Sequence, residues 1–93
     1  MRRPKVVMYA SPFCGYCAAA RHLLRDKGIE YTEIDVIAEP AKRAEMIERA
    51  GRRTVPQIFI GNTHVGGYDD ISALDSRGEL DALLLAESSG TDS

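Results

Sequence analysis

The sequence predicts an α/β fold, in which a four-stranded mixed β-sheet carries helices on both faces in the order β-α-β-α-β-β-α. A β-rich run, an amphipathic stretch and a second β-rich run follow one another within residues 5–36, a pattern typical of a right-handed parallel β-α-β unit. A second helical stretch then precedes two short β-type runs joined by Gly61-Asn62, which is a hairpin turn signal. A last helical stretch completes the pattern.

The first half of the chain supplies the β-α-β unit. Residues 5–10 are rich in β-formers and predict a buried strand. Residues 15–27 place alanines and leucines on one side and basic residues on the other, which predicts an amphipathic helix that ends at Gly28. Residues 31–36 alternate apolar with acidic side chains and predict the second strand.

The second half supplies a helix and a hairpin. Pro40 suits the first turn of a helix, which we expect to stop at Gly51. Residues 55–60 are apolar and predict a strand, and residues 63–66 return as its antiparallel partner after the turn.

A final helix is expected from Asp69 or later to about residue 86, with a break at Arg77-Gly78. Residues 88–93 contain no core-forming side chain and predict a disordered tail. The chain has no internal repeat or linker, and 93 residues allow one small domain, which we expect to span residues 1–87.

Composition excludes several classes of function. The net charge of −2 provides no overall electrostatic footprint for nucleic acid. The apolar runs are far shorter than the roughly 20 residues that a membrane helix needs, so no membrane partner is expected. The amino-terminal residues also lack the hydrophobic region of a secretory signal, which predicts a cytoplasmic protein. In that reducing compartment a close cysteine pair is more often catalytic, redox-sensing or metal-binding than a permanent cross-link.

The candidate catalytic residues are Cys14 and Cys17, which stand where the first strand ends and the first helix begins. Cys14 falls at or beside the helix N-cap, where unpaired N–H groups and the helix dipole stabilise an anion such as a thiolate. Cys17 lies three residues further along the same helix face, within bonding reach of Cys14. This spacing predicts that Cys14 attacks a disulfide and that Cys17 resolves the mixed disulfide that results.

Three other interpretations of the pair compete with this one. A structural disulfide that closes so short a loop would stabilise the fold by only about 2 kcal/mol. A zinc site needs about four ligands, and His22 and His64 are the remaining candidates, with His22 turned well around the helix and His64 expected to be a solvated strand residue. Two inert buried cysteines would explain neither the spacing nor the placement.

Two further motifs follow the cysteine pair: Thr54-Val55-Pro56-Gln57-Ile58-Phe59-Ile60 and Gly66-Gly67-Tyr68-Asp69-Asp70. With all three motifs in this order, the chain resembles the glutaredoxins from about residue 6 to residue 84, and most closely the small bacterial dithiol type. The resemblance implies a thioredoxin-like fold. It also implies reduction of protein disulfides and protein–glutathione mixed disulfides with glutathione as co-substrate, and no permanently bound cofactor.

The resemblance also implies residue roles. Cys14 would be the nucleophile and Cys17 the resolving thiol, Pro56 would follow a cis peptide bond, and the backbone of Val55 would pair with the glutathione peptide as an added strand does. Positions that match the glutathione-binding segments are Tyr16, Thr54, Val55, Pro56, Gly67, Tyr68 and Asp69.

Charge distribution agrees with a glutathione site. Glutathione carries two carboxylates and one ammonium, so its receptor should present positive charge at one end and a carboxylate or helix N-terminus at the other. Residues 42–53 are predominantly basic, and Arg52 and Arg53 are the candidates for the glycine carboxylate. Asp69 and Asp70 follow the glycine pair, where either can meet the ammonium or cap the last helix.

The chain departs from the usual dithiol pattern at two positions. Gly15 replaces the proline of the cysteine motif, and Ser11 stands where a basic residue is common, which leaves the helix N-terminus and Arg52 or Arg53 to stabilise the Cys14 thiolate. Some glutaredoxins without that proline form a homodimer around a [2Fe–2S] cluster. The alternative is therefore a cluster carrier through Cys14, whereas we expect a monomer that binds no metal. A thiol donor reduced by thioredoxin reductase is a third possibility, which the motif at residues 66–70 disfavours.

Overall fold

The computed structural model describes residues 4–90 and has one sheet with the strand order β2-β1-β3-β4. Strand β1 pairs with β2 in parallel and with β3 in antiparallel orientation, and β3 pairs with β4 in antiparallel orientation, so the mixed sheet is confirmed. The strands are β1 (Val6–Ala10), β2 (Thr32–Asp35), β3 (Gln57–Ile60) and β4 (Thr63–Gly66), and the helices are α1 (Gly15–Asp26), α2 (Pro40–Ala50), α3 (Tyr68–Ser76) and α4 (Glu79–Gly90).

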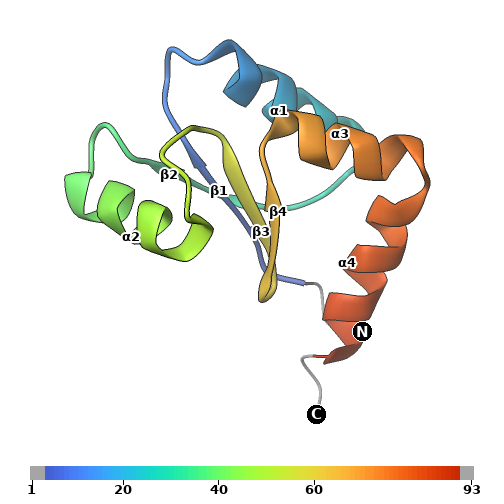
Figure 1. The fold of residues 1–93 in the computed structure, drawn as a ribbon. Coiled ribbons are helices and arrows are strands. Elements are labelled where there is room, and N and C mark those ends of the chain that lie inside the picture. Colours follow the sequence, from blue (N-terminus) through green and yellow to red (C-terminus); the bar gives the residue numbers. More distant parts are fainter. Residues whose placement is uncertain (1–3, 91–93) are drawn as a thin grey trace.

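Helices cover both faces of the sheet, as predicted. Figure 1 shows α2 on one side of the strands and α1, α3 and α4 on the other. Alternate residues of β1 pack into the cores on the two faces of the sheet, because successive side chains of a strand point to opposite faces. Met8 packs in a core cluster with residues of α1, β3, α3 and α4, whereas Tyr9 packs in a second cluster with Met46 of α2 and Phe59.

Strand β3 begins two residues later than predicted. The apolar run starts at Val55, but the ladder between β1 and β3 pairs Gln57 with Tyr9 and continues to Ile60. Pro56 has no N–H group to donate to a ladder, and the pairing with β1 starts at the residue that follows it. Val55 and Pro56 therefore form a loop beside the first turn of α1 instead of belonging to the strand.

The last helical stretch is two helices. Its break follows Arg77, where Gly78 adopts φ 73°, so the predicted break at Arg77-Gly78 is confirmed. Helix α4 is assigned to Gly90, three residues beyond the domain boundary expected at residue 87, and that boundary stays a prediction. The remainder of the predicted tail, residues 91–93, lies outside the described residues. Among residues 4–90, no helix is long and apolar enough to cross a membrane.

Candidate functional site

Cys14 is the N-cap residue of α1. Its backbone is extended, with φ −115° and ψ 118°, and its carbonyl accepts the N–H of Ala18 at 3.0 Å. Its Sγ accepts the backbone N–H of Cys17 at 3.3 Å. The first N–H groups of a helix lack partners within the helix, so a capping side chain receives them. Here the capping atom is a sulfur, which places a potential thiolate at the positive end of the helix dipole.

These contacts change the ionisation of Cys14. Burial of the sulfur opposes ionisation, but hydrogen bonds from the Cys17 thiol and from the backbone N–H groups of Cys17 and Tyr16 outweigh it. The nearby Arg21 guanidinium acts in the same direction as these hydrogen bonds. The pKa of the Cys14 thiol is therefore lowered, as its position at the helix terminus predicts.

Cys17 has the opposite character. It is fully buried in the core cluster beneath α1, and this burial raises the pKa of its thiol to about 11. Both cysteines are free thiols. One thiol is thus partly accessible with a lowered pKa, and its neighbour is inaccessible with a raised pKa. This asymmetry makes Cys14 the thiol that reacts more readily with an external disulfide, while the roles of nucleophile and resolving thiol stay a prediction.

The histidines do not join the cysteines. His22 pairs with Asp26 on the exposed side of α1, and the imidazole of His64 contacts the side chain of Gln57. Within residues 4–90, no group of three or more His, Cys, Asp or Glu side chains is arranged to hold a metal ion. The [2Fe–2S] alternative, which needs only Cys14 from each chain, stays a prediction.

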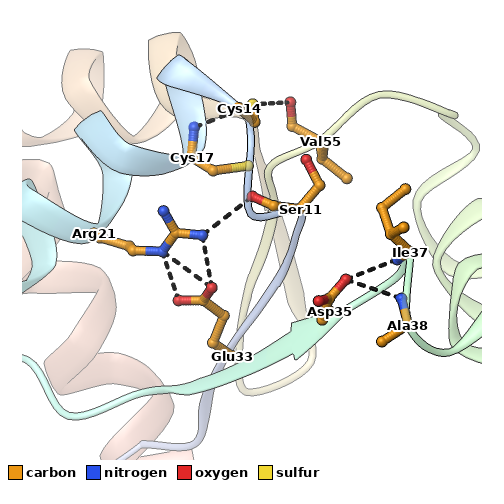
Figure 2. Close-up of polar contacts among 9 residues, drawn as sticks. All are labelled: Ser11, Cys14, Cys17, Arg21, Glu33, Asp35, Ile37, Ala38 and Val55. Carbon is orange, nitrogen blue, oxygen red and sulfur yellow. Dashed lines mark hydrogen bonds and ion pairs between the residues drawn. The ribbon is translucent and has the colours of Figure 1, made fainter.

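Arg21 is a residue of the site that the sequence interpretation missed. We expected Arg52 or Arg53 to compensate for the basic residue absent at position 11, but the charge that lowers the pKa of Cys14 is that of Arg21. Figure 2 shows its guanidinium bonded to the Ser11 carbonyl and to Glu33. Arg21 lies four residues after Cys17, one turn further along α1, and this helical spacing was the available signal.

A pocket of about 340 Å³ lies near Cys14. The Sγ of Cys14 is 3.6 Å from the Val55 carbonyl, and the Val55–Pro56 peptide bond is cis, as the resemblance implied. The tyrosine rings of Tyr16 and Tyr68 are 6.5 Å apart between centroids. The residues that line the pocket are Tyr16, Arg52, Thr54, Val55, Pro56, Gly67, Tyr68, Asp69 and Asp70. The fold thus brings together every predicted glutathione-binding residue except Arg53.

Asp70, and not Asp69, supports the start of α3. Its Oδ2 accepts the Gly67 N–H at 2.8 Å and lies 3.2 Å from Nη1 of Arg52. The hydrogen bond from Gly67 is the main reason that the pKa of Asp70 is lowered, and Arg52 adds to it. Asp70 therefore connects the basic and acidic sides of the pocket, whereas Asp69 lines the pocket.

Asp70→Asn should make the protein less stable at neutral pH, by about 0.5 to 1 kcal/mol for a partly exposed helix-terminal hydrogen bond. Because the folded state lowers the pKa of Asp70, its contribution is present above the unfolded pKa and is lost as the pH falls through the folded value. Urea denaturation at neutral and acidic pH checks this. We expect the two proteins to converge in acid, and a difference that stays constant with pH would contradict the argument.

A second group that the sequence interpretation missed supports Thr54. Gln57 is fully buried, and its Nε2 donates to the carbonyl of Thr54 at 3.0 Å and to the Thr54 hydroxyl at 3.2 Å. The Oε1 of Gln57 is 2.7 Å from Nε2 of His64. His64 lies on β4, as predicted, but it is half-buried because it also stacks on Phe59, with ring centroids 4.8 Å apart. These contacts fix the loop at one wall of the pocket.

Comparison with known proteins agrees with this geometry. The glutaredoxin family model matches residues 6–65. A glutaredoxin of Pseudomonas aeruginosa is 52% identical over 83 residues, which cover 89% of this chain and 99% of that protein. The solution structure of a Brucella melitensis glutaredoxin is 55% identical with a TM-score of 0.80, covering 90% of this chain and 91% of that chain.

A more distant structure carries a ligand. The crystal structure of a buckwheat glutaredoxin–glutathione complex is 31% identical to this chain, with a TM-score of 0.81, and the match covers 89% of this chain and 78% of that one. The family match, the high identity and the shared thioredoxin-like fold all indicate the same family. The chain therefore belongs to the glutaredoxin family of thiol–disulfide oxidoreductases.

Proposed function

We propose that this protein reduces protein disulfides and protein–glutathione mixed disulfides, with glutathione as its electron donor. The observation that carries the proposal is the position of Cys14, whose sulfur caps α1 and lies 3.6 Å from the Val55 carbonyl at one wall of the pocket. The N-terminus of α1 thus stabilises the thiolate form of Cys14, and this sulfur lies beside a pocket that has the backbone of Val55 in its wall. The free cysteines suit a reducing compartment, which supports a cytoplasmic location, and we also propose that the protein acts as a monomer.

The first step is attack by the Cys14 thiolate on a glutathionylated protein. The sulfur of Cys14 bonds to the glutathione sulfur, the mixed disulfide breaks, and the substrate protein leaves as a thiolate that takes a proton from water. A second glutathione then attacks the glutathione sulfur of the new mixed disulfide. This step releases glutathione disulfide and regenerates the Cys14 thiolate.

Reduction of a protein disulfide differs from this sequence because it uses both cysteines. Attack by Cys14 links the substrate to the protein, and Cys17 then attacks the Cys14 sulfur. The substrate leaves as a dithiol, and the Cys14–Cys17 disulfide is reduced by two molecules of glutathione. Burial of Cys17 keeps its thiol from attacking external disulfides directly, which supports a resolving role.

The pocket suits the three charged groups of glutathione. The backbone of Val55 offers an edge to which the peptide can add as a strand. Arg52 can bind the glycine carboxylate, while Asp69 and the N-terminus of α3 can bind the ammonium and carboxylate of the γ-glutamyl end. The similarity to the buckwheat glutaredoxin–glutathione complex supports glutathione as the ligand.

The decisive experiment identifies the electron donor. The oxidised protein is mixed either with glutathione, glutathione reductase and NADPH or with thioredoxin reductase and NADPH, and NADPH consumption is followed with a glutathionylated peptide as substrate. We expect turnover with the glutathione system. Turnover with thioredoxin reductase alone would contradict the proposed donor and leave the thiol chemistry intact.

Arg52→Met should raise the KM for the glutathionylated peptide by about three- to tenfold with little change in kcat, because one exposed charge contact is lost. Arg53→Met removes the adjacent charge, which lies outside the pocket-lining residues. Steady-state kinetics of both variants separates the two arginines. If Arg53→Met raises the KM and Arg52→Met does not, the carboxylate contact belongs to Arg53.

A further inference from the structure

The resolving step requires ionisation of a thiol in an unfavourable place. Cys17 is fully buried, and it shares its core cluster with uncharged side chains from β1, β3 and α3, which include Met8, Ala10, Ile58 and Ile71. Only a thiolate attacks a disulfide. A thiol whose pKa is raised to about 11 needs assistance to react at neutral pH.

Arg21 is held where it can provide that assistance. Its Nε donates to both carboxylate oxygens of Glu33 at 2.9 and 3.0 Å, and its Nη2 donates to one of them at 2.8 Å. The same Nη2 donates to the carbonyl of Ser11 at 3.2 Å. Glu33 lies on β2 and Ser11 follows β1, so the guanidinium connects α1 to two strands (Figure 2).

Ser11 lies next to both this cation and the buried sulfur. Its carbonyl accepts a hydrogen bond from Arg21, and its backbone acts on Cys17 in the direction that lowers the pKa of that thiol. The Ser11 backbone and the Arg21 charge both favour the thiolate of Cys17. Figure 2 shows the guanidinium below Cys17, with its bond to the Ser11 carbonyl at one side. The bond from Arg21 to the Ser11 carbonyl also fixes the loop after β1, to which the backbone N–H of Ser11 belongs.

We propose that Arg21, clamped by Glu33, is a positioning residue that acts through Ser11 to stabilise the Cys17 thiolate during the resolving step. The inference rests on the proposed roles of the two cysteines. In that step Cys17 loses its proton to solvent, its sulfur bonds to the Cys14 sulfur, and the bond between Cys14 and the substrate breaks. The substrate sulfur leaves with the electron pair, so no outside oxidant or reductant is needed.

The electrostatics favour this role at the moment of resolution. The titratable or charged groups that act on Cys17 are Cys14 and Arg21, while Glu33 and Tyr31 act on Arg21. In the reduced protein, the negative charge of Cys14 opposes ionisation of Cys17. Formation of the mixed disulfide removes that charge. In the mixed disulfide, burial is then the remaining effect that raises the pKa of Cys17, and the Ser11 backbone and Arg21 both lower it.

The first test separates the two thiol reactions without glutathione. Dithiobis(nitrobenzoate) reacts with Cys14 and releases one nitrobenzoate thiolate, and attack by Cys17 on the adduct releases a second. Stopped-flow absorbance resolves the two phases. Arg21→Met should slow the second phase by about three- to tenfold at neutral pH, since a higher thiol pKa lowers the thiolate fraction more than it increases nucleophilicity. The first phase should change less.

Three further variants control this result. Glu33→Gln keeps an acceptor for Arg21 but removes the compensating charge, so the second phase should become faster. Arg21→Lys keeps the charge and should restore much of the wild-type rate. Arg25→Met removes an exposed charge one turn further along α1 and should change neither phase. Equal slowing in Arg21→Met and Arg25→Met would overturn the proposal.

The second test distinguishes ionisation from a general loss of structure. In a Cys14→Ser background, the Cβ chemical shift of isotope-labelled Cys17 is followed from neutral to alkaline pH. Arg21→Met should move the titration of Cys17 to higher pH, and Glu33→Gln should move it to lower pH. A titration that Arg21→Met leaves unchanged would overturn the proposal. Failure of glutathione to support turnover would affect the proposed function alone, because neither test contains glutathione.

Discussion

Cys14→Ser should abolish reduction of a glutathionylated peptide, with a loss of about a thousandfold or more, because a serine hydroxyl does not ionise at neutral pH and cannot form the mixed disulfide. The variant should still fold, since Ser is itself a good helix N-cap residue and can receive the N–H of Cys17. The glutathione reductase-coupled assay measures the loss, and circular dichroism verifies the fold.

Cys17→Ser provides the matched comparison. The route through glutathione alone needs only Cys14, so this variant should keep part of its activity on the glutathionylated peptide. It should lose activity on a protein disulfide, because no internal thiol resolves the mixed disulfide. Retained activity in Cys14→Ser together with an inactive Cys17→Ser would reverse the assigned roles.

The second large effect concerns stability. Leu24→Ala should lower the free energy of unfolding by about 3 kcal/mol and the Tm by roughly 15 °C, because the change leaves a cavity where α1 packs on the sheet. Leu24 is fully buried and belongs to the same core cluster as Cys17. Thermal denaturation followed by circular dichroism measures the change.

Leu85→Ala is the control for this substitution. Leu85 lies on α4 and its side chain is 66% exposed, so the same chemical change removes little buried surface. We expect a loss of less than about 1 kcal/mol. Similar losses in the two variants would mean that Leu24 does not anchor α1 on the sheet.

The helix boundaries show how local signals relate to the observed fold. Helix α2 begins at Pro40 and ends before Gly51, whose φ of 70° suits glycine, and the break after Arg77 coincides with Gly78. These signals act within a few residues and are therefore readable from sequence. The start of β3 was predicted less well, because a hydrophobic run does not reveal where ladder pairing begins.

The pocket was predictable in part. The motifs at residues 54–60 and 66–70 contain most of its lining residues. These motifs are recognisable in the sequence because they contain proline and glycines, which are typical turn residues. Side-chain direction decides which of Arg52 and Arg53 lines the pocket. It also decides which of Asp69 and Asp70 supports the start of α3. Neighbouring residues of one type carry no sequence signal for such a choice.

The sequence by itself determined the order of elements, the two thiols at the start of α1 and their different environments, since these follow from hydrophobic periodicity and from the unpaired N–H groups of a helix terminus. Only the tertiary structure decided which charge acts on the thiols. Glu33 and Arg21 are twelve residues apart and meet because β2 pairs in parallel with β1 beneath α1. Electrostatic interactions depend on distance in space, and only the packed fold sets that distance.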